Sequence, residues 1–271
     1  MNNERALIGR RSSRLLNSYG PVAVVTGASD GIGRAIALRL ADAGFGLTIV
    51  ARRKALLDQL ANDLEKRSGL APQVISADLS LRDEVARVDR ETRDREVGLL
   101  VAAAGFGTSG PFIENNLADE LSMIDVNCGA LAQLTHIFGR RFAAQERGGI
   151  VLMSSLVAFQ GVPRAANYAA TKAYVQSLAE GLHQELKPLG VDVLAAAPGP
   201  VLSGFGLRAG MAMSSGQTPD EVARGTLDML GRRTTVRPGF LAKALEASLM
   251  PLPRSARIAM MARVMASMTP R

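Results

Sequence analysis

The chain of 271 residues has few of the side chains that metal and disulfide chemistry require. It contains one cysteine, Cys128, and two histidines, His136 and His183. One cysteine excludes a disulfide within the chain and fits a reducing compartment. The two histidines fall in expected helices, and with Cys128 they form no cluster with metal-ligand spacing. We therefore expect no metal site and a cytoplasmic protein.

Long hydrophobic runs are also absent. No apolar stretch reaches the roughly 18 residues that a membrane-spanning helix needs. The first twenty residues lack the continuous apolar segment of a secretory signal. Their many arginines and serines favour a solvated basic arm over residues 1–20 rather than an organelle transit peptide.

The net charge of +7 lies at one end of the chain. Residues 232–271 hold eight lysines or arginines and one acidic residue, Glu246, so this tail alone carries +7. The remainder is balanced, with no basic patch interleaved with aromatic residues and no known nucleic-acid motif. We therefore expect no nucleic-acid partner, and a salt-dependent DNA-binding assay would test the opposite hypothesis.

A glycine-rich turn stands between an expected strand, residues 22–25, and an expected helix, residues 34–43. Its spacing is Gly-x-x-x-Gly-x-Gly. The first glycine permits a tight turn, the second lets the backbone approach a pyrophosphate, and the third lets the helix pack closely on the strand. Free N–H groups at the helix N-terminus also favour phosphates. The turn predicts a dinucleotide site that comprises Gly27, Ser29, Asp30, Gly31, Ile32 and Gly33.

Two arginines follow the second expected strand, residues 46–50. An NAD site usually carries an acidic residue at this point for the ribose hydroxyls, and residues 50–53 contain none. Arg52 and Arg53 offer charge and planar donors to a 2′-phosphate. Because an arginine at a helix N-terminus opposes the helix dipole, a binding role is favoured over a pair of solvated side chains. The pattern predicts NADP as the cofactor.

The stretch from Ser154 to Lys172 follows an expected buried strand, residues 149–153, and runs into an expected helix. Tyr168 and Lys172 are four apart, so they share one face of that helix. A lysine ammonium beside a phenol favours the phenolate and lowers its pKa from the usual value of about 10. Ser155, at the strand end, can hold a substrate oxygen beside the phenol. This set predicts the transfer of one proton to or from a carbonyl or alcohol oxygen.

Together, the glycine turn and the Ser155, Tyr168 and Lys172 set resemble the short-chain dehydrogenase/reductase family in its short, non-extended branch, from about Val22 to Val201. The resemblance implies that Tyr168 donates the proton in reduction and that Lys172 also bonds the nicotinamide ribose. It implies that Ser155 orients the carbonyl and that Asn127 supports a proton relay, whereas Ser154 is a structural neighbour. It further implies cofactor contacts from residues near the strand ends: Asp78, Leu79, Ala104, Gly105, Tyr168, Lys172, Pro198, Gly199 and Val201.

The chain departs from the family pattern after the fourth expected strand. Family members usually show Asn-Asn-Ala-Gly there, whereas this chain has Ala102, Ala103, Ala104 and Gly105. The lost amides normally tie the strand end to its neighbours, so the local hydrogen bonding is left open. Asp78, which in the family holds the adenine, can also cap the helix expected at residues 81–95.

The loop at residues 202–217 is rich in glycine, methionine and serine, and we expect a mobile, apolar cover for the substrate. Its apolar lining is expected to comprise Leu202, Phe205, Leu207, Met211 and Met213, with Arg208 as the only charge. This lining favours an apolar carbonyl or alcohol substrate, such as a lipid- or steroid-like ketone, over a sugar or a small acid.

Alternating strand and helix signals predict an α/β fold: one domain with a doubly wound, Rossmann-like parallel sheet of about seven strands. Six strands are identified, at residues 22–25, 46–50, 73–77, 99–103, 149–153 and 191–197. A single long helical region is expected at residues 117–144. The expected divisions are the arm at 1–20, the cofactor-binding and catalytic domain at 21–239, and a basic, apolar helical tail at 240–271.

Pro251 and Pro253 should split this tail into two short helices. Apolar residues interleaved with arginines leave three destinations open: the chain's own domain beside the active site, a partner subunit, or peripheral contact with an anionic membrane. We expect a homo-oligomer.

Two functional alternatives are a non-catalytic NADP(H)-binding regulator, suggested by the lost asparagines, and a sugar-nucleotide epimerase of the extended branch, whose glycine spacing differs.

Overall fold

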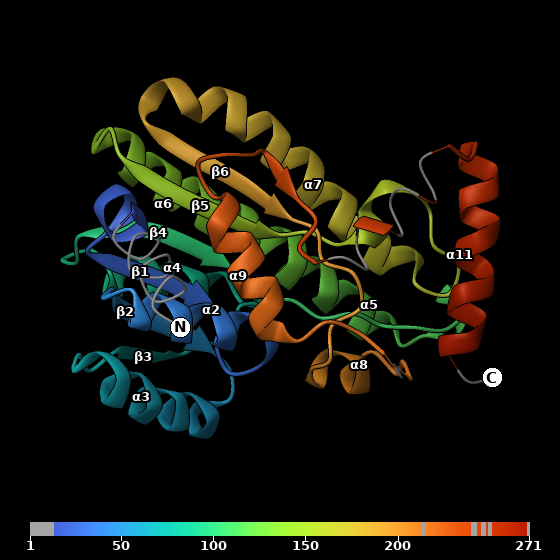
Figure 1. Ribbon diagram of the computed structural model, residues 1–271. Helices are drawn as coiled ribbons and strands as arrows, with labels where there is room; N and C mark the ends of the chain where they lie inside the picture. The colour runs from blue at the N-terminus through green and yellow to red at the C-terminus, as the bar shows by residue number, and fades with distance from the viewer. Residues whose placement is uncertain (1–13, 213–214, 240–242, 245–247, 249–250, 270–271) are drawn as a thin grey trace, which may run out of the picture.

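The computed structural model describes residues 14–212, 215–239, 243–244, 248 and 251–269. Seven parallel strands form one sheet in the order β3-β2-β1-β4-β5-β6-β7, which confirms the predicted doubly wound fold (Figure 1). The strands are β1 Val22–Thr26, β2 Gly46–Ala51, β3 Gln73–Ser76, β4 Val97–Ala102, β5 Gly148–Met153, β6 Val191–Ala196 and β7 Thr235–Val236. The seventh strand was expected but had not been located in the sequence.

Helices cover both faces of the sheet, because the central strands are apolar at every position. β4 and β5 are buried throughout, as parallel strands between two helical layers must be. One core layer joins the sheet to α2 (Gly31–Asp42), α3 (Lys54–Ser68) and α9 (Pro219–Met229). The other joins it to α4 (Arg82–Glu91), α6 (Leu131–Ala144) and α7 (Ala166–Leu186).

The strand order reverses between β1 and β4, which lie side by side in the sheet. At such a switch point the connections leave in opposite directions, so a crevice opens outside the carboxyl ends of the strands. The glycine turn follows β1, Gly105 follows β4 and Ser155 follows β5. The topology therefore brings the predicted site residues to one edge of the sheet.

The expected long helix at 117–144 has a local irregularity. The chain forms α5 (Leu117–Ile124), then a π-helical stretch over Asp125–Ala130, and then α6 without a break in direction. Asn127 lies inside the π-helical stretch. Such widened turns occur frequently at functional sites because they re-aim one side chain within a continuous helix.

The expected loop at 202–217 contains a short helix, α8 (Gly204–Arg208), whose N-cap Ser203 accepts a hydrogen bond from the Phe205 amide. The side chains of Leu202 and Leu207 are 47% and 89% exposed, so these two are not part of the apolar lining that we predicted. Phe205 and Met211 do line the cavity, and Met213 lies outside the described residues.

The described end of the N-terminal arm is part of the domain rather than solvated. Residues 14–19 are helical, and Leu15 and Tyr19 are buried in the core layer of α2 and α3. Arg14 donates hydrogen bonds to the carbonyls of Leu230 and Leu227 at 3.0 and 3.2 Å. The Tyr19 hydroxyl donates to the Asp192 carboxylate at 2.6 Å. The arginines and serines obscured this small apolar face in the sequence.

The tail ends in a helix, α11 (Arg254–Met268), which begins directly after Pro253 as expected. Most of the other helix that we predicted, before Pro251, lies outside the described residues. Figure 1 shows α11 beyond the carboxyl ends of the strands, on the side of the molecule that carries α5 and α8. Over the described ranges, no helix is long and apolar enough to cross a membrane.

The contact between Tyr19 and Asp192 predicts a measurable stability effect. Tyr19→Phe removes only the hydroxyl and leaves the partly buried Asp192 carboxylate without this donor, so the free energy of unfolding should fall by about 1–3 kcal/mol. Tyr174→Phe is the control, because Tyr174 is 43% exposed and surface changes are usually within about 0.5 kcal/mol. Urea unfolding checks this, and equal midpoints for both variants would show that the arm does not stabilise the domain.

Candidate active site

The glycine turn has the backbone geometry that its spacing predicts. Gly27 and Gly31 have φ angles of 66° and 53°, in the left-handed region that favours glycine. A methyl group on Gly33 would collide with the Gly27 carbonyl, so helix α2 packs directly against the turn. Asp30 caps α2, since its carboxylate accepts from the Gly31 amide at 2.7 Å. The turn and the N-terminus of α2 together form a concave backbone surface suited to a pyrophosphate.

The two arginines lie at the end of β2, beside this turn. Arg53 donates to the Ser29 hydroxyl at 3.1 Å and lies 3.8 Å from the Asp30 carboxylate. Arg52 lies 3.8 Å from Asp78. These ion pairs are long and half exposed, so both guanidinium groups retain donors for a further anionic group.

Asp78 does not cap helix α4, contrary to one of the two roles that we considered. The N-cap position is Leu81, which has no side-chain cap. The Asp78 carboxylate instead accepts from the amide and hydroxyl of Ser80 at 3.0 and 2.8 Å. Burial acts against the charge, but the Ser80 hydrogen bonds and the charge of Arg52 lower the pKa of Asp78. Asp78 is therefore an anion on the wall of the cavity.

Thr26 and Asn127 replace the lost asparagines as ties for the end of β4. The Ala104 amide donates to the Thr26 hydroxyl at 3.1 Å. Asn127 is 1% exposed, and its amide group accepts from the Phe106 amide at 3.1 Å and donates to the Phe106 carbonyl at 2.9 Å. It also donates to the Thr171 hydroxyl at 3.1 Å. In this structure Asn127 therefore positions the β4 loop against α7.

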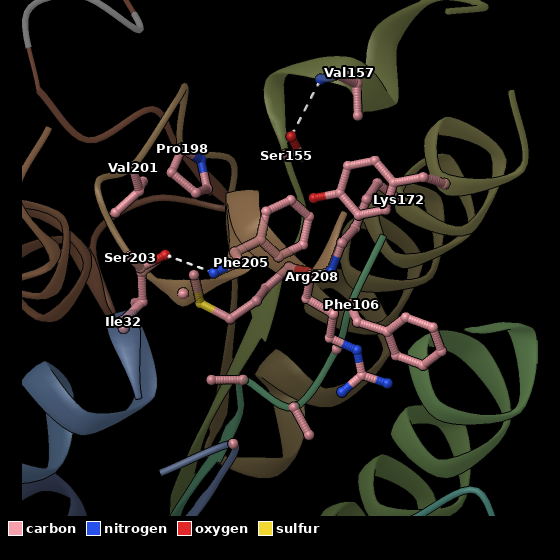
Figure 2. A pocket seen from close by; sticks show the side chains of 18 of the residues that line it. Ile32, Phe106, Ser155, Val157, Lys172, Pro198, Val201, Ser203, Phe205 and Arg208 are labelled. Atoms are coloured by element: carbon pink, nitrogen blue, oxygen red, sulfur yellow. Dashed lines mark hydrogen bonds between the residues drawn. The ribbon is translucent and has the colours of Figure 1, made fainter. Parts of the chain in front are cut away.

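Tyr168, Ser155 and Lys172 meet at the same place. The Ser155 hydroxyl accepts from the Val157 amide at 3.4 Å (Figure 2). It also lies within hydrogen-bonding reach of the Tyr168 phenol. The Lys172 ammonium lies 5.7 Å from the centroid of the Tyr168 ring and donates to the Met153 carbonyl at 2.8 Å. Ser154 is structural as expected, since its hydroxyl donates to the Lys172 carbonyl at 3.1 Å.

The expected lowering of the Tyr168 pKa by Lys172 is not found. Burial of the phenol raises the pKa of Tyr168 to about 12, and the hydrogen bond from Ser155 offsets only part of this shift. Burial also lowers the pKa of Lys172 to about 8, which weakens its charge near neutral pH. The sequence placed the two side chains on one helix face, but it could not show that both are desolvated or that Lys172 is directed at Met153.

A cavity of about 460 Å³ joins these groups. The glycine turn and the arginines form one end, and Ser155 and Tyr168 stand beyond them. Its lining includes most of the predicted residues, among them Asp78, Leu79, Ala104, Gly105, Pro198, Gly199 and Val201. Asn127 does not line it, because its amide is turned into the protein.

Helix α11 covers the substrate end of this cavity. Its lining side chains are Met260, Met261, Val264, Met265 and Met268. Met265 is buried against Val162, Ala165 and Ala169. Two hydrogen bonds hold the end of the tail: the Ala212 amide donates to the Met268 carbonyl at 2.8 Å, and Arg164 donates to the Thr269 hydroxyl at 2.5 Å. Of the three destinations left open for the tail, the structure shows packing on its own domain.

Several contributors to the site escaped the sequence analysis, among them Phe106, Arg208 as a contact residue, and the α11 residues Met261 and Met265. The Phe205 ring packs on Tyr168 with 5.3 Å between the ring centroids, and the Arg208 guanidinium lies 3.9 Å above the Phe106 ring (Figure 2). No motif marks these positions. The apolar periodicity of the tail was the one available signal, and it did not specify which surface the tail covers.

The residues present fit a bound NADP(H). A methyl group on Gly31 would lie 3.2 Å from the Ser203 side chain, and one on Gly27 would lie 2.7 Å from the Ala103 carbonyl oxygen, so side chains at these positions would displace the turn from its neighbours. Arg52 and Arg53 supply the cations that a 2′-phosphate requires. No group of three or more histidine, cysteine, aspartate or glutamate residues is placed to hold a metal ion in the part of the chain that the structure describes.

A doubly wound sheet with a glycine turn at its switch point and a serine, tyrosine and lysine set at the same edge defines a dinucleotide-dependent oxidoreductase. The family model described as short chain dehydrogenase matches residues 21–209. The chain therefore belongs to the short-chain dehydrogenase family and is an oxidoreductase.

Individual relatives extend over most of the chain. A 7beta-hydroxysteroid dehydrogenase of Clostridium sardiniense is 30% identical over 227 residues, which cover 82% of this chain and 87% of the relative. The structure of a short-chain dehydrogenase from Sphingobium yanoikuyae in complex with NADPH is 33% identical, with a TM-score of 0.76, over 88% of this chain and 98% of that one. A bulky-bulky ketone specific alcohol dehydrogenase from Comamonas testosteroni is 30% identical, with a TM-score of 0.73, over 87% and 96% of the two chains.

The two shifted pKa values predict a pH profile for carbonyl reduction. Tyr168, with its pKa raised to about 12, keeps its proton through the neutral range, whereas Lys172 loses its charge as the pH rises through about 8. We expect kcat/KM for reduction to fall on the alkaline side with an apparent pKa near 8, which reports the free enzyme. A profile that stays level to pH 10 would show that the charge of Lys172 is not needed.

Proposed function

We propose that the protein interconverts an apolar ketone and the corresponding alcohol with NADP(H) as the hydride carrier. The observation that carries this proposal is one cavity with two unlike ends. Its cofactor end has a glycine turn flanked by two arginines, and its substrate end is lined by methionine side chains from α11, with Ser155 and Tyr168 between them. The bound nicotinamide would supply the hydride.

Tyr168 serves as the general acid in the reducing direction. Its phenol is protonated at neutral pH because burial raises its pKa, and it lies within hydrogen-bond reach of Ser155. A carbonyl oxygen placed between these two hydroxyls accepts a hydrogen bond from Ser155 and the proton from Tyr168. The alcohol forms as the phenol becomes a phenolate, and the nearby Lys172 ammonium stabilises that negative charge.

Lys172 and Asn127 maintain this arrangement from the protein side. The bond from Lys172 to the Met153 carbonyl holds the ammonium beside Gly105, where a methyl group would lie 3.5 Å from its nitrogen. We propose that Lys172 also bonds the ribose of the bound cofactor, as in the family that the chain resembles. Asn127 acts as a positioning residue for Phe106 and Thr171. This complete set disfavours the alternative of a non-catalytic NADP(H)-binding regulator.

The substrate end favours a bulky apolar molecule. Met211 from the loop packs in one apolar cluster with Met261 and Met265 from α11, Phe205 lines the same cavity, and methionines adapt to irregular apolar shapes. The relatives named for a hydroxysteroid and for bulky ketones agree with this class. Peripheral membrane contact through the tail, a homo-oligomer and a cytoplasmic location stay predictions.

Cofactor choice is tested by changing both arginines. The double variant Arg52→Ala, Arg53→Ala should weaken NADPH by about tenfold or more, because each charge-assisted hydrogen bond to a phosphate contributes about 1.5–3 kcal/mol. Its affinity for NADH should change little. Arg67→Ala, at the far end of α3, is the control, since that arginine pairs with Asp42. Fluorescence titration measures the affinities, and equal wild-type affinities for NADPH and NADH would refute the preference.

Substrate class is tested by a screen for NADPH oxidation with steroid-like ketones, long-chain ketones and sugars. We expect turnover of the apolar compounds. Met265→Gln places an unpaired amide in the apolar wall, so KM for these ketones should rise about tenfold, at a cost of one to two kcal/mol. Ser267→Ala, on the exposed side of α11, is the control. Good turnover of sugars with no activity toward apolar ketones would reject this substrate class.

A further inference from the structure

Arg208 lies at the wall of the cofactor cavity and forms no ion pair with the residues that the structure describes. Its guanidinium stacks on the Phe106 ring at 3.9 Å. Among the described residues, no carboxylate oxygen lies within 4.0 Å of it, whereas Arg52 and Arg53 each have one within that distance. The Arg208 side chain is exposed at the wall of the cavity, so its guanidinium keeps donors that an anionic ligand in the cavity could use.

The charges that line the cavity are unbalanced in the same sense. Besides Tyr168, the titratable lining residues are four basic ones, Arg52, Arg53, Lys172 and Arg208, and two carboxylates, Asp30 and Asp78. Burial lowers the pKa of Arg208, the charges of Arg52 and Arg53 lower it further, and the charges of Asp119 and Asp78 oppose this shift. Arg208 therefore lies in the same electrostatic field as the two arginines of the cofactor end, where a ligand that carries phosphates would be favoured.

Helix α8 places Arg208 over the cofactor end. The helix begins against the phosphate-binding turn: a methyl group on Gly204 would collide with the Asp30 carboxylate, and one on Gly31 would lie 3.2 Å from Ser203. Figure 2 shows Ser203 next to Ile32 and Arg208 next to Phe106. From the N-cap to its last residue, α8 thus extends from the glycine turn to the end of β4, the two places between which a dinucleotide lies.

We infer that Arg208 binds a phosphate group of NADP(H) and thereby fastens α8 over the bound cofactor. The inference rests on the proposed cofactor. A substrate carboxylate is the competing source of negative charge, but the substrate end is lined by methionines. The charges that shift the pKa of Arg208 belong to the cofactor end, Arg52, Arg53 and Asp78, and to Asp119 of α5. Since Phe205 of the same helix packs on Tyr168, fastening α8 would also exclude water from the phenol.

Fluorescence titration with NADPH and with NADH tests this inference on two variants. Arg208→Met keeps an unbranched side chain over Phe106 but removes the charge, and Arg208→Lys keeps the charge. We expect the Met variant to bind NADPH about tenfold more weakly and the Lys variant to lie between it and the wild type. Loss for both dinucleotides assigns the contact to the pyrophosphate, and loss for NADPH alone assigns it to the 2′-phosphate.

Arg232→Met is the matched control. Arg232 is exposed and lies just before the N-terminal end of β7, whereas the cofactor cavity lies at the carboxyl ends of the parallel strands. Wild-type affinities for both dinucleotides in Arg208→Met would overturn the inference. In that case a higher KM for a carboxylated ketone, with no change for its methyl ester, would assign Arg208 to the substrate instead. If the wild type binds only NADH, the proposed NADP preference fails, and the inference then requires Arg208→Met to weaken NADH.

Amide hydrogen exchange separates fastening from a merely structural role. In the wild type, saturating NADPH should slow exchange over residues 202–212. In Arg208→Met, saturating NADPH should leave that segment as fast as without cofactor, although the glycine turn becomes protected in both proteins. Equal cofactor-dependent protection of the segment in the two proteins would contradict a closing role for Arg208.

Discussion

The hydrogen bond from the Lys172 ammonium to the Met153 carbonyl, at 2.8 Å, fixes the relation between α7 and β5 on which the whole site depends. It satisfies a buried cation at the end of a strand, where an unpaired one would be costly. It also fixes the position of α7 along β5, so that Tyr168, one helical turn before Lys172, reaches Ser155 at the end of β5. Asn127 fixes the position of α7 relative to β4 in a similar way, because its amide hydrogen-bonds both to Phe106, in the loop after β4, and to Thr171 of α7.

Burial gives these residues their chemistry and also limits it. The desolvated phenol keeps its proton and is ready to donate it, while the desolvated ammonium holds its charge only below a pH of about 8. The side chains of α11 and Phe205, which cover the cavity, maintain this low-dielectric environment. Stabilisation of charge in such a site is worth more than in water, so the packing that would cover an apolar substrate would also favour the proposed proton transfer.

Local patterns in the sequence predicted the fold and most of the site. The strand and helix periodicity around Gly27, Gly31 and Gly33 predicted the dinucleotide-binding turn, and the spacing of Tyr168 and Lys172 predicted that both side chains lie on one face of a helix beside it. The pKa of Tyr168 could not be predicted in this way, because it depends on burial by segments distant in the chain. For the same reason the sequence did not reveal that Met265 roofs the cavity, that Arg208 stacks on Phe106, or that Tyr19 is buried.

The central claim is that Tyr168 transfers the proton within an otherwise intact cofactor site. Single-turnover oxidation of NADPH by a ketone substrate tests it in Tyr168→Phe, with NADPH deuterated at the transferred position to show that hydride transfer limits the rate. The account predicts unchanged affinity for NADPH and a rate lowered by about 10²–10⁴-fold, the usual contribution of a general acid. A wild-type rate with a full isotope effect in this variant would contradict it.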